Sequence, residues 1–135
     1  MIFLEGLKIK GEWFLQYNND PWIGPLPNAM EVGGLSRLAQ HTETLPSCYI
    51  AIGAAGGEVF RKAVGAVIRS SNLLRFRSTL SLSEGNGDHT WLELYSDASD
   101  TSGSGTKINH LNQDFSKTNV QVLNIECRLT FKQGA

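Results

Sequence analysis

The stretch Leu123-Asn124-Ile125-Glu126-Cys127-Arg128-Leu129-Thr130-Phe131 decides the fold class of this chain. Apolar and polar residues alternate through it without a break. Because successive side chains of a β-strand point to opposite faces of a sheet, the apolar set would enter a core and the polar set would face water. A helix would distribute both sets around its circumference. Residues 119–131 are therefore predicted to form a strand that is buried on one face.

A second alternating stretch precedes it, at residues 73–82. Its apolar set is Leu74, Phe76, Leu80 and Leu82, and its polar set is Arg75, Arg77, Thr79 and Ser81. The following residues 84–88 contain an Asn-Gly pair, which accepts the positive φ of a tight turn. We therefore predict a half-buried antiparallel strand, and a hairpin that joins it to a strand at residues 91–95.

Shorter elements are predicted around these two strands. Residues 48–52 have the composition of a strand, and the run of small residues at 53–57 would end it. A short strand is expected at residues 107–111. Residues 97–106 contain no apolar side chain larger than Ala, so they are predicted to form a mobile loop.

The beginning of the chain is less regular. Residues 3–17 are predicted to form one strand. Residues 18–27 hold three prolines and a glycine, a composition that opposes both helices and β-ladders, so they are predicted to form a loop. Asn28 precedes Glu31 by three residues, as an N-cap does in a capping box, and a short helix is expected from there to about Gln40.

Together these patterns predict a mainly β protein. The expected fold is an antiparallel β-sandwich of jelly-roll type with one short helix near the N-terminus, and a small barrel is the alternative. The chain is divided into an N-terminal strand and Pro-rich arm, residues 1–27, and a β-sandwich domain, residues 28–135.

Composition limits the expected partners. The 135 residues include 12 Lys plus Arg against 13 Asp plus Glu, a formal net charge of -1, so no large positive field exists to attract nucleic acid or an anionic membrane. The chain starts without the features of a secretory signal, and no apolar run reaches the ~18 residues of a membrane span, which favours a cytoplasm. Cys48 and Cys127 lie in apolar alternating segments and are expected to be reduced core residues, with a disulfide as the alternative.

Three histidines, His41, His89 and His110, are the candidates for acid-base chemistry, and none stands at a known spacing from a nucleophile. The chain has no Gly-x-Ser-x-Gly, His-Glu-x-x-His or Cys-x-x-Cys motif. Residues 103–107 lack the spacing of a phosphate-binding loop, and residues 97–100 lack that of a helical calcium loop. We therefore predict no catalytic, cofactor-binding or metal-binding residue, and a protein that is not an enzyme.

Five residues are candidates for contacts with a partner protein. Arg75 and Arg77 point the same way from one predicted strand, and with Arg61 they belong to the region richest in positive charge; Arg is enriched at interfaces. Trp22 lies among prolines and could anchor a neighbouring protein, and Trp13 lies in the same N-terminal arm. The alternatives are a solvated sheet face for the arginines and burial in the core for the tryptophans.

Several segments stand in an order that carries a resemblance. They are Tyr49-Ile50-Ala51-Ile52-Gly53, Glu58-Val59-Phe60-Arg61-Lys62-Ala63-Val64, Leu74-Arg75-Phe76, Glu84-Gly85-Asn86-Gly87, Leu92-Glu93-Leu94-Tyr95, Phe115-Ser116-Lys117-Thr118 and the closing strand. Over about residues 49–131 this order resembles a family of small virion proteins of tailed phages and prophages. The chain departs from the family pattern at Gly85, where Ala is usual, at Leu94-Tyr95, where Leu-Phe is common, and at Cys127, where an aromatic residue is frequent.

The resemblance implies a non-enzymatic structural protein of the virion, assembled in the host cytoplasm. The first expectation is a capsid decoration or cement protein that binds the major capsid protein and forms a homotrimer. The second is a tail-fibre or tail-tip appendage that recognises a receptor through residues 83–90 and 97–106. A third expectation, which does not come from the resemblance, is a small hydrolase or sugar-modifying enzyme, because jelly-roll scaffolds can host catalytic sites.

Overall fold

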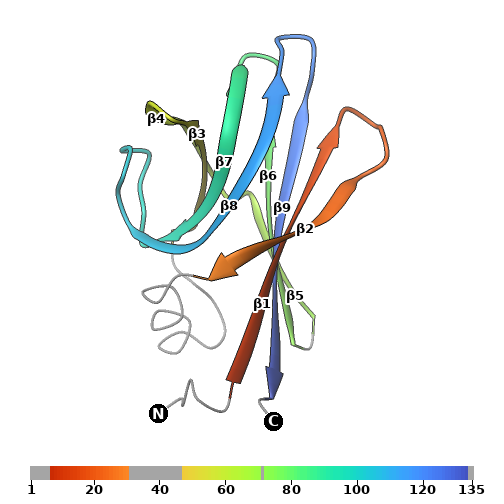
Figure 1. Ribbon diagram of the computed structural model, residues 1–135, viewed down its shortest axis with the longest axis vertical. Helices are drawn as coiled ribbons and strands as arrows, with labels where there is room; N and C mark the ends of the chain where they lie inside the picture. The colour runs from red at the N-terminus through yellow and green to blue at the C-terminus, as the bar shows by residue number, and fades with distance from the viewer. Residues whose placement is uncertain (1–6, 31–46, 71, 134–135) are drawn as a thin grey trace.

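The computed structural model describes residues 7–30, 47–70 and 72–133, and these residues form antiparallel strands joined by turns (Figure 1). The strands are β1 (Leu7–Tyr17), β2 (Ile23–Met30), β3 (Tyr49–Ala54), β4 (Gly57–Ala63), β5 (Ala66–Ser70), β6 (Leu73–Leu80), β7 (Gly87–Ser96), β8 (Thr106–Lys117) and β9 (Leu123–Gln133). The predicted mainly β class is confirmed.

The strands make two sheets that share one strand. The overall order is β4-β3-β7-β8-β2-β1-β9-β6-β5. Sheet A contains β5, β6, β9, β1 and β2. Sheet B contains β4, β3, β7, β8 and the end of β2. Strand β2 links them because it pairs with β1 along most of its length, while its end, Ala29 and Met30, pairs with His110 and Asn109 of β8. The chain also crosses from sheet B to sheet A between β4 and β5, where the Gly65 amide donates to the carbonyl of Arg77.

The core lies between the two sheets. The closing strand supplies four of its residues, Leu123, Ile125, Cys127 and Leu129, which are all fully buried, as their alternation predicts. Burying each large apolar side chain contributes roughly 1.5–3 kcal/mol. Facing residues from the other strands complete the same cluster: Trp13, Leu15, Cys48, Ile50, Ile52, Leu74, Phe76, Leu80, Leu92, Leu94, Ile108 and Leu111. Leu82, expected in the core, follows the end of β6 and is exposed.

The described residues of the expected N-terminal arm pair with the rest of the sheet. Strand β1 pairs with β9 over its whole length and with β2 on its other side, so it is an inner strand of sheet A (Figure 1). Residues 23–27, predicted to be loop, belong to β2 despite Pro25 and Pro27. A proline removes a ladder bond only where its missing N–H would face a partner. In the part of the chain that the structure describes, β2 has a neighbouring strand on one side only over this span.

The helix expected from Asn28 to Gln40 is contradicted at its start. Asn28 to Met30 form the end of β2 and pair with β1 and β8. Pairing of the strand with both sheets outweighs the capping preference of Asn28. The remaining residues of that expected helix lie outside the described residues.

The expected hairpin between β6 and β7 is also wrong. Strand β6 pairs with β5 and β9, whereas β7 pairs with β3 and β8, so residues 81–86 carry the chain from sheet A to sheet B. Gly85 has φ +65 and a Cβ there would lie 2.9 Å from a methyl group of Leu80 and 3.0 Å from one of Ile52. The glycine therefore lets this crossing pack directly on the end of the core.

Candidate functional site

Three arginines converge on one buried carboxylate on the outer face of sheet A. Arg75 and Arg77 extend outward from β6, and Arg128 extends from the neighbouring β9, as the alternation of both strands predicts. All three donate to Glu126: Arg75 at 3.1 and 3.2 Å, Arg77 at 2.5 and 2.9 Å, and Arg128 through its Nε. Glu126 was predicted to face water, but the three guanidinium groups leave only 1% of it exposed.

The charges of this cluster do not cancel. Burial by itself would raise the pKa of Glu126, but the hydrogen bonds from Arg75, Arg128 and Arg77 outweigh it and hold that pKa below its ordinary value. Glu126 is therefore ionised at neutral pH and compensates one of the three cations. The arginines remain between 28% and 37% exposed, so two positive charges in excess are presented to solvent.

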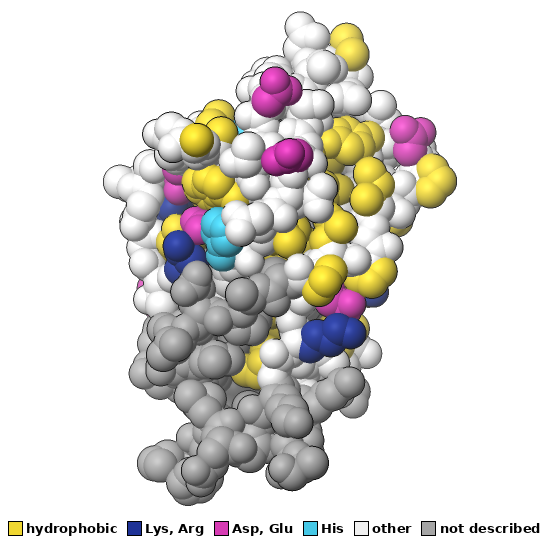
Figure 2. Space-filling model, in the orientation of Figure 1, with side chains coloured by type: hydrophobic (Ala, Val, Ile, Leu, Met, Phe, Trp, Pro, Cys, Tyr) yellow, Lys and Arg dark blue, Asp and Glu magenta, His cyan; other side chains and the backbone are white. Residues whose placement is uncertain are grey.

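Aromatic rings complete this surface. The guanidinium carbon of Arg77 lies 5.4 Å from the centre of the Trp22 ring, and that of Arg128 lies 4.1 Å from the centre of the Phe14 ring. Trp22 is 38% exposed and precedes β2, beside Ile23, which is 47% exposed. Figure 2 shows hydrophobic side chains gathered over the hairpin of β1 and β2. We call Arg75, Arg77, Arg128, Glu126 and Trp22 the arginine face.

Two of the five candidate partner residues, Trp13 and Arg61, are buried in this structure. Trp13 is fully buried in the core, so its indole ring cannot reach a partner. The side chain of Arg61 is 2% exposed and pairs with Glu58 at 2.7 Å. Arg61 also donates to the carbonyls of Ser99 and Ser104 and lies over the Tyr95 ring. The loop at residues 97–106, predicted to be mobile, is therefore attached to β4 by this buried arginine.

A second polar cluster, which the sequence did not predict, lies on the outer face of sheet B. Glu93 of β7 and His110 of β8 are register partners, and His110 Nδ1 lies 2.6 Å from Glu93 Oε2. Glu93 also accepts hydrogen bonds from the hydroxyl of Tyr95 at 2.7 Å and pairs with Lys107 at 3.0 Å. Burial would raise the pKa of Glu93, but these hydrogen bonds lower it below its ordinary value.

This second cluster is internally satisfied. The other ring nitrogen of His110, Nε2, lies 2.7 Å from the side-chain oxygen of Asn112. Both nitrogens of the imidazole are therefore occupied, and each oxygen of Glu93 has a partner. A general base needs a lone pair directed at a substrate proton, so the arrangement favours a structural role for His110.

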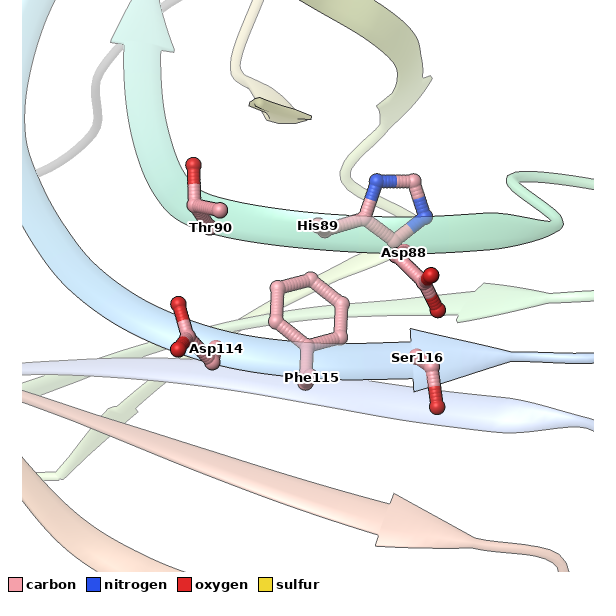
Figure 3. Close-up of a pocket in the computed structure, with 6 residues that line it drawn as sticks. All are labelled: Asp88, His89, Thr90, Asp114, Phe115 and Ser116. Carbon is pink, nitrogen blue, oxygen red and sulfur yellow. The ribbon is translucent and has the colours of Figure 1, made fainter. Parts of the chain in front are cut away.

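A shallow pocket of about 440 Å³ lies where β7 begins and β8 ends (Figure 3). Its lining residues are Asp88, His89, Thr90, Asp114, Phe115 and Ser116. His89 stacks against Phe115 with 5.0 Å between ring centres, and its Nε2 lies 2.7 Å from the carbonyl of Gly85. Part of the pocket belongs to the region 83–90 that the sequence predicted as a contact with a receptor.

The cysteines behave as predicted. Cys48 and Cys127 are both buried and neither forms a disulfide, and burial raises the pKa of each thiol to about 12. Cys127 also accepts a hydrogen bond from the side-chain amide of Asn109 at 3.1 Å. Both thiols are therefore protonated at neutral pH and act as small core residues.

The described residues contain no group of three or more His, Cys, Asp or Glu side chains placed to hold a metal ion. None of their segments is a helix long and apolar enough to cross a membrane. No protein-family model matches the chain, and neither a curated protein nor a solved structure matches it.

Proposed function

We propose that this protein is a non-enzymatic structural component that attaches to a larger assembly through the arginine face. The observation that carries the proposal is the excess of two positive charges beside an exposed Trp22 on the outer surface of a five-stranded sheet. Trp and Arg are the residues most enriched among those that dominate binding energy at protein interfaces. The excess charge favours a partner surface rich in carboxylates.

The arginine face suits a role in binding because its geometry is fixed before a partner arrives. Glu126 holds the three guanidinium groups in place, and Trp22 and Phe14 support two of them through their rings. Side chains that are already ordered lose less conformational entropy on binding. A carboxylate of a partner would therefore meet positioned donors.

The assembly that we propose is a phage virion. The support is the resemblance of residues 49–131 to small virion proteins, together with the sandwich of two antiparallel sheets. The protein would serve as a capsid decoration or cement protein that binds the major capsid protein and self-associates. A jelly-roll relationship of the sandwich belongs to this proposal, and the repeated crossing of the chain between the sheets supports it.

One observation favours the second candidate, a tail appendage that recognises a receptor. The pocket where β7 begins and β8 ends combines Phe115 with the carboxylates of Asp88 and Asp114 and the hydroxyls of Thr90 and Ser116. Sites that bind small molecules commonly combine apolar or aromatic surface with a few polar groups. Such a pocket at the end of the sandwich would face outward from a tail tip.

Immunogold electron microscopy tests the proposal. An antibody against the chain is applied to particles released from the cells that encode it. Label over the head supports a decoration protein, and label confined to the tail supports the appendage. The absence of label from every particle, with the protein present in the cell lysate, would contradict a virion role.

A further inference from the structure

We infer that two copies of this chain pair through β5 and so join their A sheets across a twofold axis. Among the described residues, strand β5 is the last strand of sheet A and pairs only with β6. All five of its residues are exposed, including Val67 at 43% and Ile68 at 37%. An edge strand presents unpaired N–H and C=O groups, and an exposed apolar edge is a template for a further strand.

The edge is held in place at both ends. At its start, the Gly65 amide donates to the carbonyl of Arg77. After its end, Asn72 and Phe131 of β9 exchange hydrogen bonds: the Phe131 amide donates to the Asn72 carbonyl at 2.8 Å, and the Asn72 side chain donates to the Phe131 carbonyl at 2.9 Å. A strand that is already extended and anchored loses little entropy when another strand is added.

The sequence of β5 fits a second copy of itself. In antiparallel self-pairing with Ile68 on the twofold axis, Ile68 faces Ile68, Val67 faces Arg69, and Ala66 faces Ser70. No like charges stand directly opposite, and the central pair is a β-branched apolar pair of the kind that stabilises sheets. The strand contains no proline, so every amide that points to the open edge can donate.

The other outer strand, β4, is less suitable for pairing. It carries Glu58, Arg61 and Lys62 within seven residues, and charged side chains protect edges against pairing. Its Lys62 is also paired with Glu84 at 2.7 Å, and Arg61 is occupied by the loop at residues 97–106. Strand β5 has one charged residue, Arg69.

Pairing through β5 would extend the arginine face over two copies. Ile68 is the register partner of Arg75, and Ala66 that of Arg77, so the outer faces of both copies would be continuous. The two β6 strands would be three strand spacings apart, roughly 14 Å. This exceeds the screening length of about 8 Å at physiological salt, so repulsion between the two arginine clusters is small.

The dimer is expected to be weak. A pair of five-residue strands buries less than the roughly 1,200 Å² of a standard interface, so we expect dissociation constants in the micromolar to millimolar range. An isologous contact of this kind closes with two copies and does not generate a trimer. Self-pairing through β5 does not require that the arginine face has a partner.

Sedimentation over a concentration series up to about 1 mM tests this inference. The wild-type chain is expected to form dimers, and Ile68→Lys, which places two like charges on the axis, is expected to raise the dissociation constant at least tenfold. Val59→Lys, at an exposed apolar position of the other outer strand, β4, is the matched control and should leave the dissociation constant unchanged. Thermal unfolding of both variants verifies that they are folded.

Oxidation of an Ile68→Cys variant provides an independent readout. Paired Cα atoms across an antiparallel ladder lie about 4.5–5.5 Å apart, within reach of a disulfide, so a covalent dimer is expected. Ser70→Cys should give little covalent dimer, because Ser70 of one copy would face Ala66 of the other. A wild-type chain that stays monomeric, a trimer that Ile68→Lys leaves intact, or equal crosslinking of both cysteine variants would overturn the inference.

Discussion

Arg77 of β6 binds the buried carboxylate of Glu126 on β9 through two of its nitrogens, at 2.5 and 2.9 Å, while 37% of the Arg77 side chain stays exposed. The carboxylate thus fixes the position of a cation that it does not fully neutralise, because Arg75 and Arg128 share it. A surface that is both ordered and charged results from this relationship.

Removing the carboxylate tests how strongly it orders the arginines. We predict that Glu126→Gln lowers the free energy of unfolding by about 2 kcal/mol, because the hydrogen bonds of the guanidinium groups to a buried charge are lost while the arginines can turn to water. Urea unfolding measures the change. Glu12→Gln is the control, because Glu12 of β1 lies on the same outer face of sheet A as Glu126. The ion pair of Glu12 with Lys10 should contribute less than about 0.5 kcal/mol.

The stability of the protein is predicted to fall in acid. The pKa values of Glu58, Glu93 and Glu126 are held below their ordinary values in the folded state. The unfolded chain therefore takes up protons first as the pH falls below about 4.5, and the stabilisation is lost as the pH drops further through the folded-state values. Urea midpoints at pH 6 and pH 3.5 should differ, and less so in Glu126→Gln. Equal midpoints would contradict this account of the carboxylates.

The attachment of the loop at residues 97–106 depends on Arg61. We predict that Arg61→Met lowers stability by about 3 kcal/mol, since it leaves the partly buried Glu58 without its cation, and that the amides of the loop lose protection against hydrogen exchange. Lys62→Met removes only a partly exposed pair with Glu84 and should cost less than about 1 kcal/mol. Loop amides that exchange equally fast in all three proteins would show that Arg61 does not hold the loop.

Close packing of β3 against β7 predicts a sharp difference between two glycines. A Cβ at Gly53 would lie 2.2 Å from the Trp91 ring and 2.5 Å from the carbonyl of Gly57, whereas a Cβ at Gly56 would meet nothing within 4 Å. Gly53→Ala is therefore expected to lower stability by about 2 kcal/mol and Gly56→Ala to change it little. Thermal unfolding of both variants measures the difference, and equal stability would contradict the packing.

The N-terminal strands are predicted to be essential for folding. Deleting residues 1–27 removes β1, most of β2 and the buried Trp13, and it uncovers one edge of β9. We expect the truncated chain to lose cooperative unfolding, measured by circular dichroism in urea. Deleting residues 1–6 leaves the described strands complete and serves as the control. A cooperative transition in the chain that lacks residues 1–27 would restore the interpretation of these residues as an arm.

The sequence predicted the strands whose pattern reports burial directly. The alternation in β9 and β6 identified their core sides and placed Arg75 and Arg77 outside. It did not predict pairing, because the Asn-Gly turn after β6 suits a hairpin, while the crossing to sheet B is decided by where the apolar faces meet. The burial of Glu126 could not be predicted either, because it depends on which strand pairs with β9 and brings its arginines close.

The role of Arg61 and Trp13 could not be predicted either. An arginine among other cations reads as a surface residue until the loop that covers it, which follows almost forty residues later in the sequence, is placed beside it. Trp13 lies in a stretch without clean alternation, and its burial follows from the inner position of β1 between β2 and β9. Both outcomes are set by long-range pairing.

Co-sedimentation with the particle tests the central claim, that the arginine face attaches the protein to its assembly. Particles lacking the protein are mixed with the wild-type chain, with a Trp22→Ser, Arg77→Gln variant, or with a Val59→Ser, Lys62→Gln control that alters a similar pair of residues on β4. We predict that the wild type and the control bind equally and that the arginine-face variant, still folded, loses at least tenfold in affinity. Full occupancy by that variant would contradict the claim.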